Sequence, residues 1–411
     1  MRTKIVRKKL SNGLRVLLLK NKSNDIAVMI SFKVGLVNET KENNGVSHFV
    51  EHMLWQGNYN RTAEKIRKEF DAIHGAFNAF TESGVTKYCM MCPKRHFAKA
   101  LEIFAEVIQK PVFNEEEIEK EKKVILNEMS QSNDVVPTEL SKMMDNSIYG
   151  SHPFSLDVIG TKETVGKMNK QMLEEHYNKF YVPNNAILAI NGDVKNALPL
   201  VKKCFKFKPK KIPKSVSFNP NTFKGPQIVK QEKPINTSYI GLCYVTPGWQ
   251  NKSVYALEII EDILEHSQEL SLLEEIRNKK GLTYSLDTSI SLTKNHGGIG
   301  VTLSTDKKEV PNVIQIIQDK IIKMEHITEK ELTKSKKRLI KQRKNILKSK
   351  NEIVTLTNLA ITCESNKTWD KFYNKTKKIE QVTTKDIEYA VRNYLNQNYV
   401  LATIEQTEVV Q

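Results

Sequence analysis

The sequence predicts an α+β protein made of two similar halves, each with strands and with helices packed on one face of a sheet. Its 411 residues, 39% of them hydrophobic, are enough for two domains with sizeable cores. The segment from Phe205 to Pro226 is rich in lysine and proline, which is typical of a linker, and it lies near the middle of the chain. We therefore expect an N-terminal domain over residues 1–207, a linker over 208–226 and a C-terminal domain over 227–411.

In the first half, we expect strands around Val16, Met29, Phe80 and Met90, each within a short apolar stretch. A helix is predicted over residues 115–129, EEEIEKEKKVILNEM, where most of the charged side chains are expected to face solvent. These elements supply both the sheet and part of the helical layer of the first half.

The two halves also resemble each other in sequence. Residues 100–125 and 311–339 each contain a helix with periodic apolar residues, a short connection and a charged helix. Aligning Glu117 with Glu331, a shift of 214 positions, brings these segments into register. The same shift pairs His48 with Asp262, Glu51 with Glu265, His52 with His266 and Glu128 with Gln342. The second half is therefore expected to be a degenerate copy that keeps the scaffold and lacks a metal-ligand set.

The net charge of +17 raises the possibility of a nucleic-acid-binding protein, with its densest basic stretch between Lys334 and Lys350. Apolar residues recur in this region every seven positions, at Leu332, Leu339, Ile346 and Ile353. That pattern predicts a helix with an apolar stripe and a basic outer face, and no aromatic residue is available there for stacking on bases. We therefore predict no nucleic-acid partner, although the charge is expected to favour acidic peptides through long-range steering.

The run His48-Phe49-Val50-Glu51-His52 carries the strongest chemical signal in the chain. Residues four apart lie on one face of a helix, so both imidazoles can point at a single ion while Glu51 lies beside them. This is the arrangement expected for zinc and a general base. From the pentapeptide alone, a metal site and a helix that merely carries two histidines are supported equally.

An open zinc site needs a third protein ligand, and Glu128 at the end of the predicted 115–129 helix is the candidate. The apolar run from Val124 to Leu126 lies just before it, which brings its carboxylate close to a buried stripe. Glu121 lies two helical turns earlier on the same face. We predict that Glu121 orients a ligand, with a solvated surface glutamate as the alternative.

With these residues, the chain resembles the pitrilysin, or mitochondrial processing peptidase, family of zinc metallopeptidases, in which H-x-x-E-H is followed by a glutamate ligand at a similar spacing. Further family-like stretches occur in order along the chain: residues 12–16 (NGLRV), 78–81 (NAFT), 160–161 (GT), 181–185 (YVPNN), 192–193 (GD), 276–277 (IR) and 281–284 (GLTY). The resemblance therefore covers nearly the whole sequence. It implies two similar halves, each an antiparallel sheet with helices on one face.

The resemblance also implies an activity and roles for particular residues. It implies a zinc endopeptidase that holds one Zn²⁺ per chain, with an activated water and Glu51 as general base, acting on peptides or unfolded segments. Asn78 would contact the backbone of a peptide substrate. Arg277 and Tyr284 would close over that substrate, whereas without the resemblance they would be a surface charge and a core residue.

Partners and location follow from the same comparison. Family members of this length pair, so we expect a homodimer or a heterodimer with a related subunit. The main alternative is a non-catalytic or partner-dependent subunit, because the family contains members that kept the fold and lost the zinc site. The first twenty residues predict neither a signal peptide nor a membrane span, so we expect a cytoplasmic protein without a membrane partner.

Three stretches depart from the family pattern, although none removes a proposed ligand. They are His74 in place of a glycine, the region around Gly84, and residues 264–268 (LEHSQ). They leave the substrate and the cleavage preference open.

Overall fold

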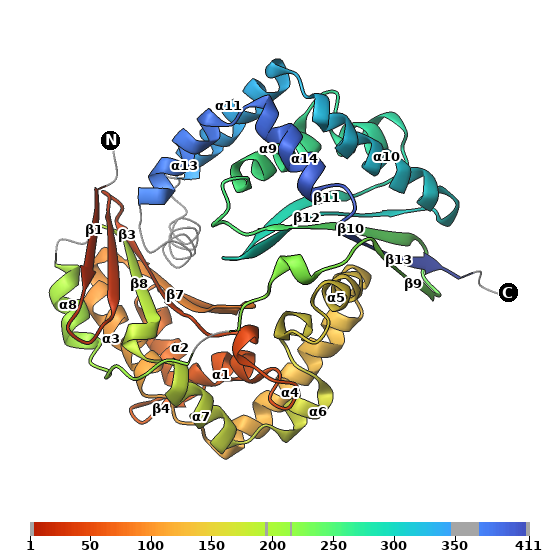
Figure 1. Ribbon diagram of the computed structural model, residues 1–411. Helices are drawn as coiled ribbons and strands as arrows, with labels where there is room; N and C mark the ends of the chain where they lie inside the picture. The colour runs from red at the N-terminus through yellow and green to blue at the C-terminus, as the bar shows by residue number, and fades with distance from the viewer. Residues whose placement is uncertain (1–3, 194–195, 214–215, 347–369, 408–411) are drawn as a thin grey trace. The chain divides into compact units, whose positions relative to one another are not determined.

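The computed structural model describes residues 4–193, 196–213, 216–346 and 370–407, which fall into two compact units (Figure 1). The first unit contains the described residues up to Gln131 together with Leu156–Val216. The second contains Ser132–Ser155, Ser217–Asn345 and the described residues from 370 onward. The predicted α+β fold with two similar halves is confirmed.

The first unit is built on a six-stranded sheet with the order β1-β2-β8-β3-β7-β6. Its strands are β1 Lys4–Lys9, β2 Arg15–Lys20, β3 Asp25–Phe32, β6 Ala76–Thr81, β7 Thr86–Pro93 and β8 Ala186–Gly192. The strands expected around Val16, Met29, Phe80 and Met90 are all present. Neighbouring strands are antiparallel except β2 and β8, which run parallel. A two-stranded ladder, β4 Gly57–Asn58 and β5 Arg61–Thr62, is separate from this sheet.

Helices supply the rest of the first core. They are α1 Val46–Leu54, α2 Ala63–Ala72, α3 Phe97–Gln109, α4 Glu115–Asn133, α6 Lys162–Lys167, α7 Lys170–Phe180 and α8 Ala197–Cys204. Alternate residues of the strands, such as Val16 and Leu18 of β2, join the same buried cluster as Phe49 of α1 and Phe104 of α3. The inward-facing residues of the strands, which alternate along the chain, therefore pack against the apolar stripes of the helices in one core.

The second unit contains a five-stranded sheet with the order β11-β12-β10-β13-β9. Its strands are β9 Gln227–Lys233, β10 Ser238–Pro247, β11 Leu286–Leu292, β12 His296–Thr305 and β13 Tyr399–Gln406. Its helices are α5 Val136–Tyr149, α9 Val254–His266, α10 Val310–Lys323, α11 Glu329–Ile346, α13 Asp370–Gln381 and α14 Thr384–Tyr394, with a π-helical segment η6 at Leu273–Lys279. Here β13 and β9 form the parallel pair.

The duplication extends to the topology. Helix α7 begins at Lys170 and α14 at Thr384, a separation of 214 positions, and α4 and α11 begin at Glu115 and Glu329 with the same separation. The strand order β2-β8-β3-β7-β6 of the first unit corresponds to β9-β13-β10-β12-β11 of the second, including the parallel pair. The shift of 214 positions inferred from the sequence therefore relates two copies of one sheet. Each copy is antiparallel apart from one parallel pair.

Helix α5 belongs to the second unit, whereas the sequence predicted that residues 1–207 form the N-terminal domain. Its buried residues Leu140, Met144 and Ile148 pack with Val400 and Ala402 of β13, on the sheet face opposite the one that contacts α9 and α14. A Cβ at Gly241 of β10 would lie 2.8 Å from the sulfur of Met144, so a glycine permits this close approach. Helices therefore cover both faces of this sheet, in contrast to the single covered face that the sequence predicts.

The basic helix of the second unit is α11. Leu332 is fully buried, and Leu339 packs against the same core, as expected for an apolar stripe. Ile353 and residues 347–350 of the predicted basic stretch lie outside the described residues. Among the helices of the described part of the chain, none is long and apolar enough to cross a membrane.

Candidate metal centre

Helix α1 carries the H-x-x-E-H residues, and the buried carboxylate of Glu39 fixes its start. The Oε2 atom of Glu39 accepts from the backbone N–H of Gly45 at 2.8 Å, and its Oε1 atom accepts from that of Ser47 at 2.9 Å. These N–H groups lie at the helix start, where no intrahelical acceptor is available. Gly45 has a φ of 90°, a left-handed conformation that favours glycine. The position of His48 therefore depends on a side chain that precedes the helix.

His48, His52 and Glu128 converge in the first unit. Each offers one possible ligand atom, and these atoms all lie within 4.8 Å of one another. The Nε2 atoms of His48 and His52 lie 3.8 and 3.5 Å from Oε2 of Glu128. Two imidazole nitrogens and one carboxylate oxygen form the donor set that zinc accepts in catalytic sites with a fourth position left for water. The residues fit a zinc ion.

Glu121 contacts the opposite side of one imidazole. Its Oε2 atom lies 2.9 Å from Nδ1 of His52, while Nε2 of the same ring faces Glu128. Glu121 is itself buried, with 8% of its surface exposed. A carboxylate on Nδ1 fixes the tautomer that carries its proton there and leaves Nε2 as a lone-pair donor. The surface-charge alternative for Glu121 does not agree with this burial and contact.

The two histidines differ in their electrostatic surroundings. Burial, together with the neighbouring His52, lowers the pKa of His48 to about 3, so this ring is neutral at physiological pH. Burial also acts to lower the pKa of His52, but the hydrogen bond to Glu121 and the charges of Glu51, Glu121 and Glu128 outweigh it and raise that pKa. Neutral imidazole is the form that binds a metal.

Glu51 lies on the same helix and points toward the end of strand β6. Its Oε2 atom accepts a hydrogen bond of 2.6 Å from the hydroxyl of Thr81. Burial raises the pKa of Glu51, and the bond from Thr81 lowers it in part. A raised pKa makes a carboxylate a stronger proton acceptor, which suits a general base. This contact between Thr81 and Glu51 is not predicted from the sequence.

Strand β6, which ends at Thr81, is an edge strand of the first sheet. Asn78 lies on it with an exposed side chain, whose Oδ1 atom accepts from the backbone N–H of Ala79 at 2.8 Å. Phe77, on the alternate face, stacks on Trp55 at the end of α1 with ring centroids 4.1 Å apart. Strand β6 therefore contacts α1 at two points. Phe77 stacks on Trp55 at the end of the helix, and Thr81 donates a hydrogen bond to Glu51 within it.

Arg277 and Tyr284 belong to the second unit. Arg277 is exposed in the π-helical segment η6, and its guanidinium lies 5.5 Å from the centre of the Tyr284 ring. Tyr284 is 85% exposed, which excludes the core position that the sequence alone would assign to it. The two side chains form an exposed cation–π pair.

The departures from the family pattern also have structural explanations. His74 has a φ of 51°, a left-handed conformation in which glycine is at no disadvantage. Gly84 lies exposed in the turn between β6 and β7. Residues 264–268 end helix α9, where the Ser267 hydroxyl accepts from the backbone N–H groups of Glu269 and Leu270.

Comparisons with known proteins bear on this arrangement. The insulinase family, peptidase family M16, matches residues 15–162, and the peptidase M16 inactive domain matches residues 167–339. An uncharacterized zinc protease of Rickettsia felis is 30% identical over 80% of this chain and 80% of its own length. The chain belongs to peptidase family M16.

Further relatives are similar to most of this chain. The uncharacterized zinc protease YmxG of Bacillus subtilis is 27% identical over 79% of this chain and 80% of its own length. Cytochrome b-c1 complex subunit 1 of Rattus norvegicus is 25% identical over 80% of this chain and 71% of its own length. The crystal structure of a protease from Helicobacter pylori superimposes with a TM-score of 0.89 at 21% identity, covering 98% of this chain and 100% of that one. The last comparison concerns the fold alone.

Proposed function

We propose that the chain is a zinc-dependent endopeptidase with Glu51 as general base and His48, His52 and Glu128 as ligands of one Zn²⁺. The observation that carries the proposal is the convergence of two imidazoles and a carboxylate within 4.8 Å, beside the half-buried Glu51 on the same helix as the two histidines. When bound by such ligands, zinc polarises a water molecule and lowers its pKa to about 7. The membership of family M16 and the relatives named zinc proteases support the same assignment.

The residues of this chain then have distinct tasks. Glu51 takes a proton on its carboxylate and delivers it to the leaving amine, while Thr81 holds that carboxylate in place. Glu121 orients His52 through Nδ1. The free edge of β6, with Asn78 on it, is suited to an extended peptide that adds as a further strand and is recognised mainly by backbone hydrogen bonds.

Further parts of the proposal concern the second unit and the assembly. Arg277 and Tyr284 would contact the substrate, since both side chains are exposed and can donate hydrogen bonds to peptide carbonyl oxygens. We also propose that the chain pairs with a second copy or a related subunit in the cytoplasm.

A non-catalytic or partner-dependent subunit is the second candidate. The similarity to cytochrome b-c1 complex subunit 1 favours it, as does the match of the second half to a domain described as inactive. The retention of all three proposed ligands and of Glu51 in the first unit favours a peptidase instead.

The decisive experiment combines zinc analysis of the purified protein with cleavage of a mixed library of unstructured peptides. Wild type is compared with Glu51→Gln, which preserves size and removes the proton acceptor. We expect one zinc per chain in both proteins and cleavage only by wild type. Zinc without cleavage by wild type would favour the partner-dependent subunit, and absence of zinc from wild type would contradict the metal centre.

A further inference from the structure

Three side chains of helix α1 belong to the candidate metal centre, and two of them are oriented by a hydrogen bond from another element. Glu51 accepts from the hydroxyl of Thr81 at 2.6 Å, and Nδ1 of His52 lies 2.9 Å from Oε2 of Glu121. Nδ1 of His48, in contrast, is buried and has no hydrogen-bond partner among the described residues. The position of the His48 ring therefore depends on how the backbone of α1 is held.

A buried histidine of helix α7 contacts the first turn of α1 beside His48. Nε2 of His176 lies 3.1 Å from the hydroxyl oxygen of Ser47, and both side chains are buried. The two helices pack against each other within the first unit (Figure 1). Burial, together with the neighbouring Lys179, lowers the pKa of His176 to about 3, so the ring is neutral at physiological pH. His176 therefore bonds, from a separate helix, to the residue that precedes His48.

Ser47 is held from two directions. Its backbone N–H donates to Oε1 of Glu39 at 2.9 Å, and its hydroxyl bonds to His176. The first contact fixes the start of α1, and the second opposes rotation of the helix about its axis. A rotation of about 10° moves a side-chain atom that lies about 6 Å from the axis by about 1 Å. Because zinc–ligand distances vary by only about 0.2 Å, a metal centre on this helix is sensitive to such a rotation.

The second unit provides an internal comparison for this hydrogen bond. Helices α9 and α14 pack against each other there, as α1 and α7 do in the first unit. Under the shift of 214 positions, Leu173 of α7 corresponds to Ile387 of α14, and both are fully buried. His176 corresponds instead to the buried Ala390, which has no polar side-chain atom. The helix pair therefore packs without this bond in the unit whose sequence does not repeat the full set of metal ligands.

We propose that His176 is a positioning residue of the metal centre, which holds the first turn of α1 through Ser47 and thereby places Nε2 of His48. The proposal rests on the proposed function, because it assumes that His48 binds zinc. His176 acts through Ser47 and takes no part in the reaction itself. Loss of its polar atom should therefore lower the affinity for zinc more than a packing defect in the same helix does.

The test is the affinity of the full chain for zinc, measured by competition with a chelator. His176→Leu removes the polar atom, and His176→Gln returns one near the position of Nε2. Leu173→Ala is the matched control, because it leaves a cavity on the same helix and keeps the hydrogen bond. We expect His176→Leu to lower zinc affinity about tenfold, as loss of a residue that orients metal ligands does, and His176→Gln to restore most of it. Leu173→Ala should destabilise the protein to urea and leave zinc affinity unchanged.

Cobalt substitution provides a second measurement that does not depend on turnover. The visible absorption of Co²⁺ depends on the geometry of its ligands, so His176→Leu should change the spectrum and Leu173→Ala should not. Ser47→Ala removes the same hydrogen bond from the other side with little change in volume, so it should reproduce the effects of His176→Leu. The loss of zinc affinity in the double variant should not exceed the larger of the two single losses, because both changes break one bond. Ser47→Ala also serves as the test if His176→Leu does not fold.

The outcomes separate this proposal from the proposed function. Unchanged zinc affinity in His176→Leu and Ser47→Ala would overturn the positioning role and leave the peptidase intact. An equal loss of affinity in Leu173→Ala would also overturn it, because the effect would then come from the packing of α7 alone. If the affinities follow the expected order but wild type cleaves no peptide, the peptidase is overturned and the positioning role is supported. Absence of zinc from wild type would overturn both.

Discussion

The buried ion pair between Asp262 and Arg338 lies where the second unit would carry its first metal ligand. Asp262 pairs with His48 under the shift of 214 positions, and its side chain is 2% exposed. The guanidinium of Arg338 donates to its two carboxylate oxygens at 2.7 to 3.2 Å, which is a bidentate arrangement between α9 and α11. We expect this pair to be essential for the stability of the second unit.

The magnitude depends on which partner is removed. Loss of one partner of a buried pair typically costs about 3–5 kcal/mol because the other charge is left without compensation. Arg338→Ala leaves a carboxylate that water hardly reaches, so we expect a loss of about 4–5 kcal/mol. Asp262→Ala leaves a guanidinium whose side chain is 29% exposed and can be hydrated, so we expect only about 3 kcal/mol. Replacing both residues with leucine should cost less than either single change.

Urea unfolding at pH 7 measures these free energies, and amide hydrogen exchange of α9 assigns the loss to the second unit. Lys337→Ala, on the same helix with an exposed side chain, is the matched control and should change the midpoint little. The reasoning is refuted if Arg338→Ala costs less than Asp262→Ala, or if both cost under about 1 kcal/mol, the range of exposed pairs.

Three further predictions concern the metal centre and the pH dependence of stability. Glu121→Gln should weaken zinc binding by about 10- to 100-fold in competition with a chelator, because His52 loses its orienting carboxylate. An unchanged zinc affinity would show that Glu121 does not orient His52. Thr81→Val removes a hydrogen bond that lowers the pKa of Glu51, so this pKa should rise and the acidic limb of the pH–rate profile should move to higher pH. Burial lowers the pKa of His296 to about 4, so its contribution to stability is complete above pH 6.5 and is lost as the pH falls toward 4, in total about 3 kcal/mol. His296→Phe should flatten the stability profile in that window, whereas substitution of the exposed His326 should not.

Sequence patterns predicted what local periodicity can specify. The four-residue spacing of His48 and His52 and the seven-residue spacing of Glu121 and Glu128 each place two side chains on one helical face, and the structure brings the two faces together. The contact between Thr81 and Glu51 was not predicted, because it depends on how β6 lies against α1. The only available signal was that Thr81 ends a family-like strand, which gives no partner for its hydroxyl.

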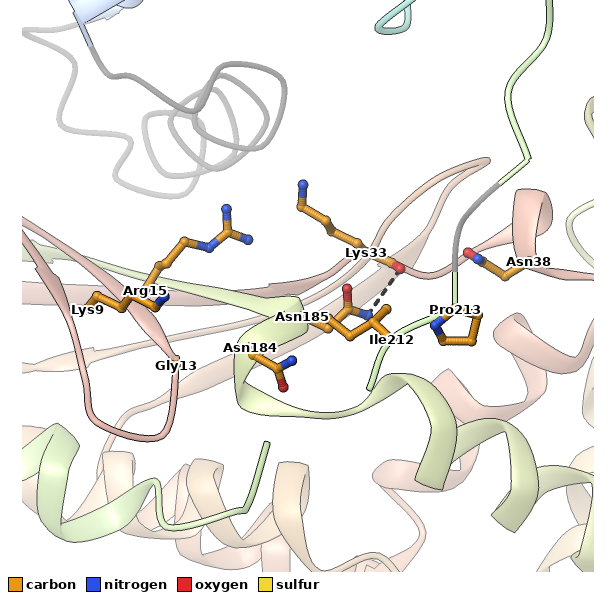
Figure 2. Close-up of a pocket in the computed structure, with 9 residues that line it drawn as sticks. All are labelled: Lys9, Gly13, Arg15, Lys33, Asn38, Asn184, Asn185, Ile212 and Pro213. Atoms are coloured by element: carbon orange, nitrogen blue, oxygen red, sulfur yellow. Dashed lines mark hydrogen bonds between the residues drawn. The ribbon is translucent and has the colours of Figure 1, made fainter. Parts of the chain in front are cut away.

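Longer-range features were missed for the same reason. The apolar spacing of Leu140, Met144 and Ile148 indicates a helix, but spacing does not say which sheet the helix covers, and α5 packs on the sheet that follows it in the chain. Arg15, Lys33 and Asn184 are far apart in sequence and line one cavity of the first unit (Figure 2). They become neighbours only because β8 pairs with β2 in parallel and with β3 in antiparallel orientation. Each residue alone is an ordinary polar side chain at a strand end.

Two side chains of the second unit oppose a metal site at the position that corresponds to His48. Under the shift of 214 positions, Arg338 stands where the first unit has Val124, and Ser335 stands in place of Glu121. A histidine at 262 would therefore face the guanidinium of Arg338, whose charge opposes a divalent cation. The hydroxyl of Ser335 is buried without a hydrogen-bond partner among the described residues, and it is neutral where Glu121 would supply an anion. The two units share one scaffold, but the second has an internal ion pair where the first has its candidate metal ligands. The proposed catalysis would therefore depend on the first unit's side chains rather than on the shared topology.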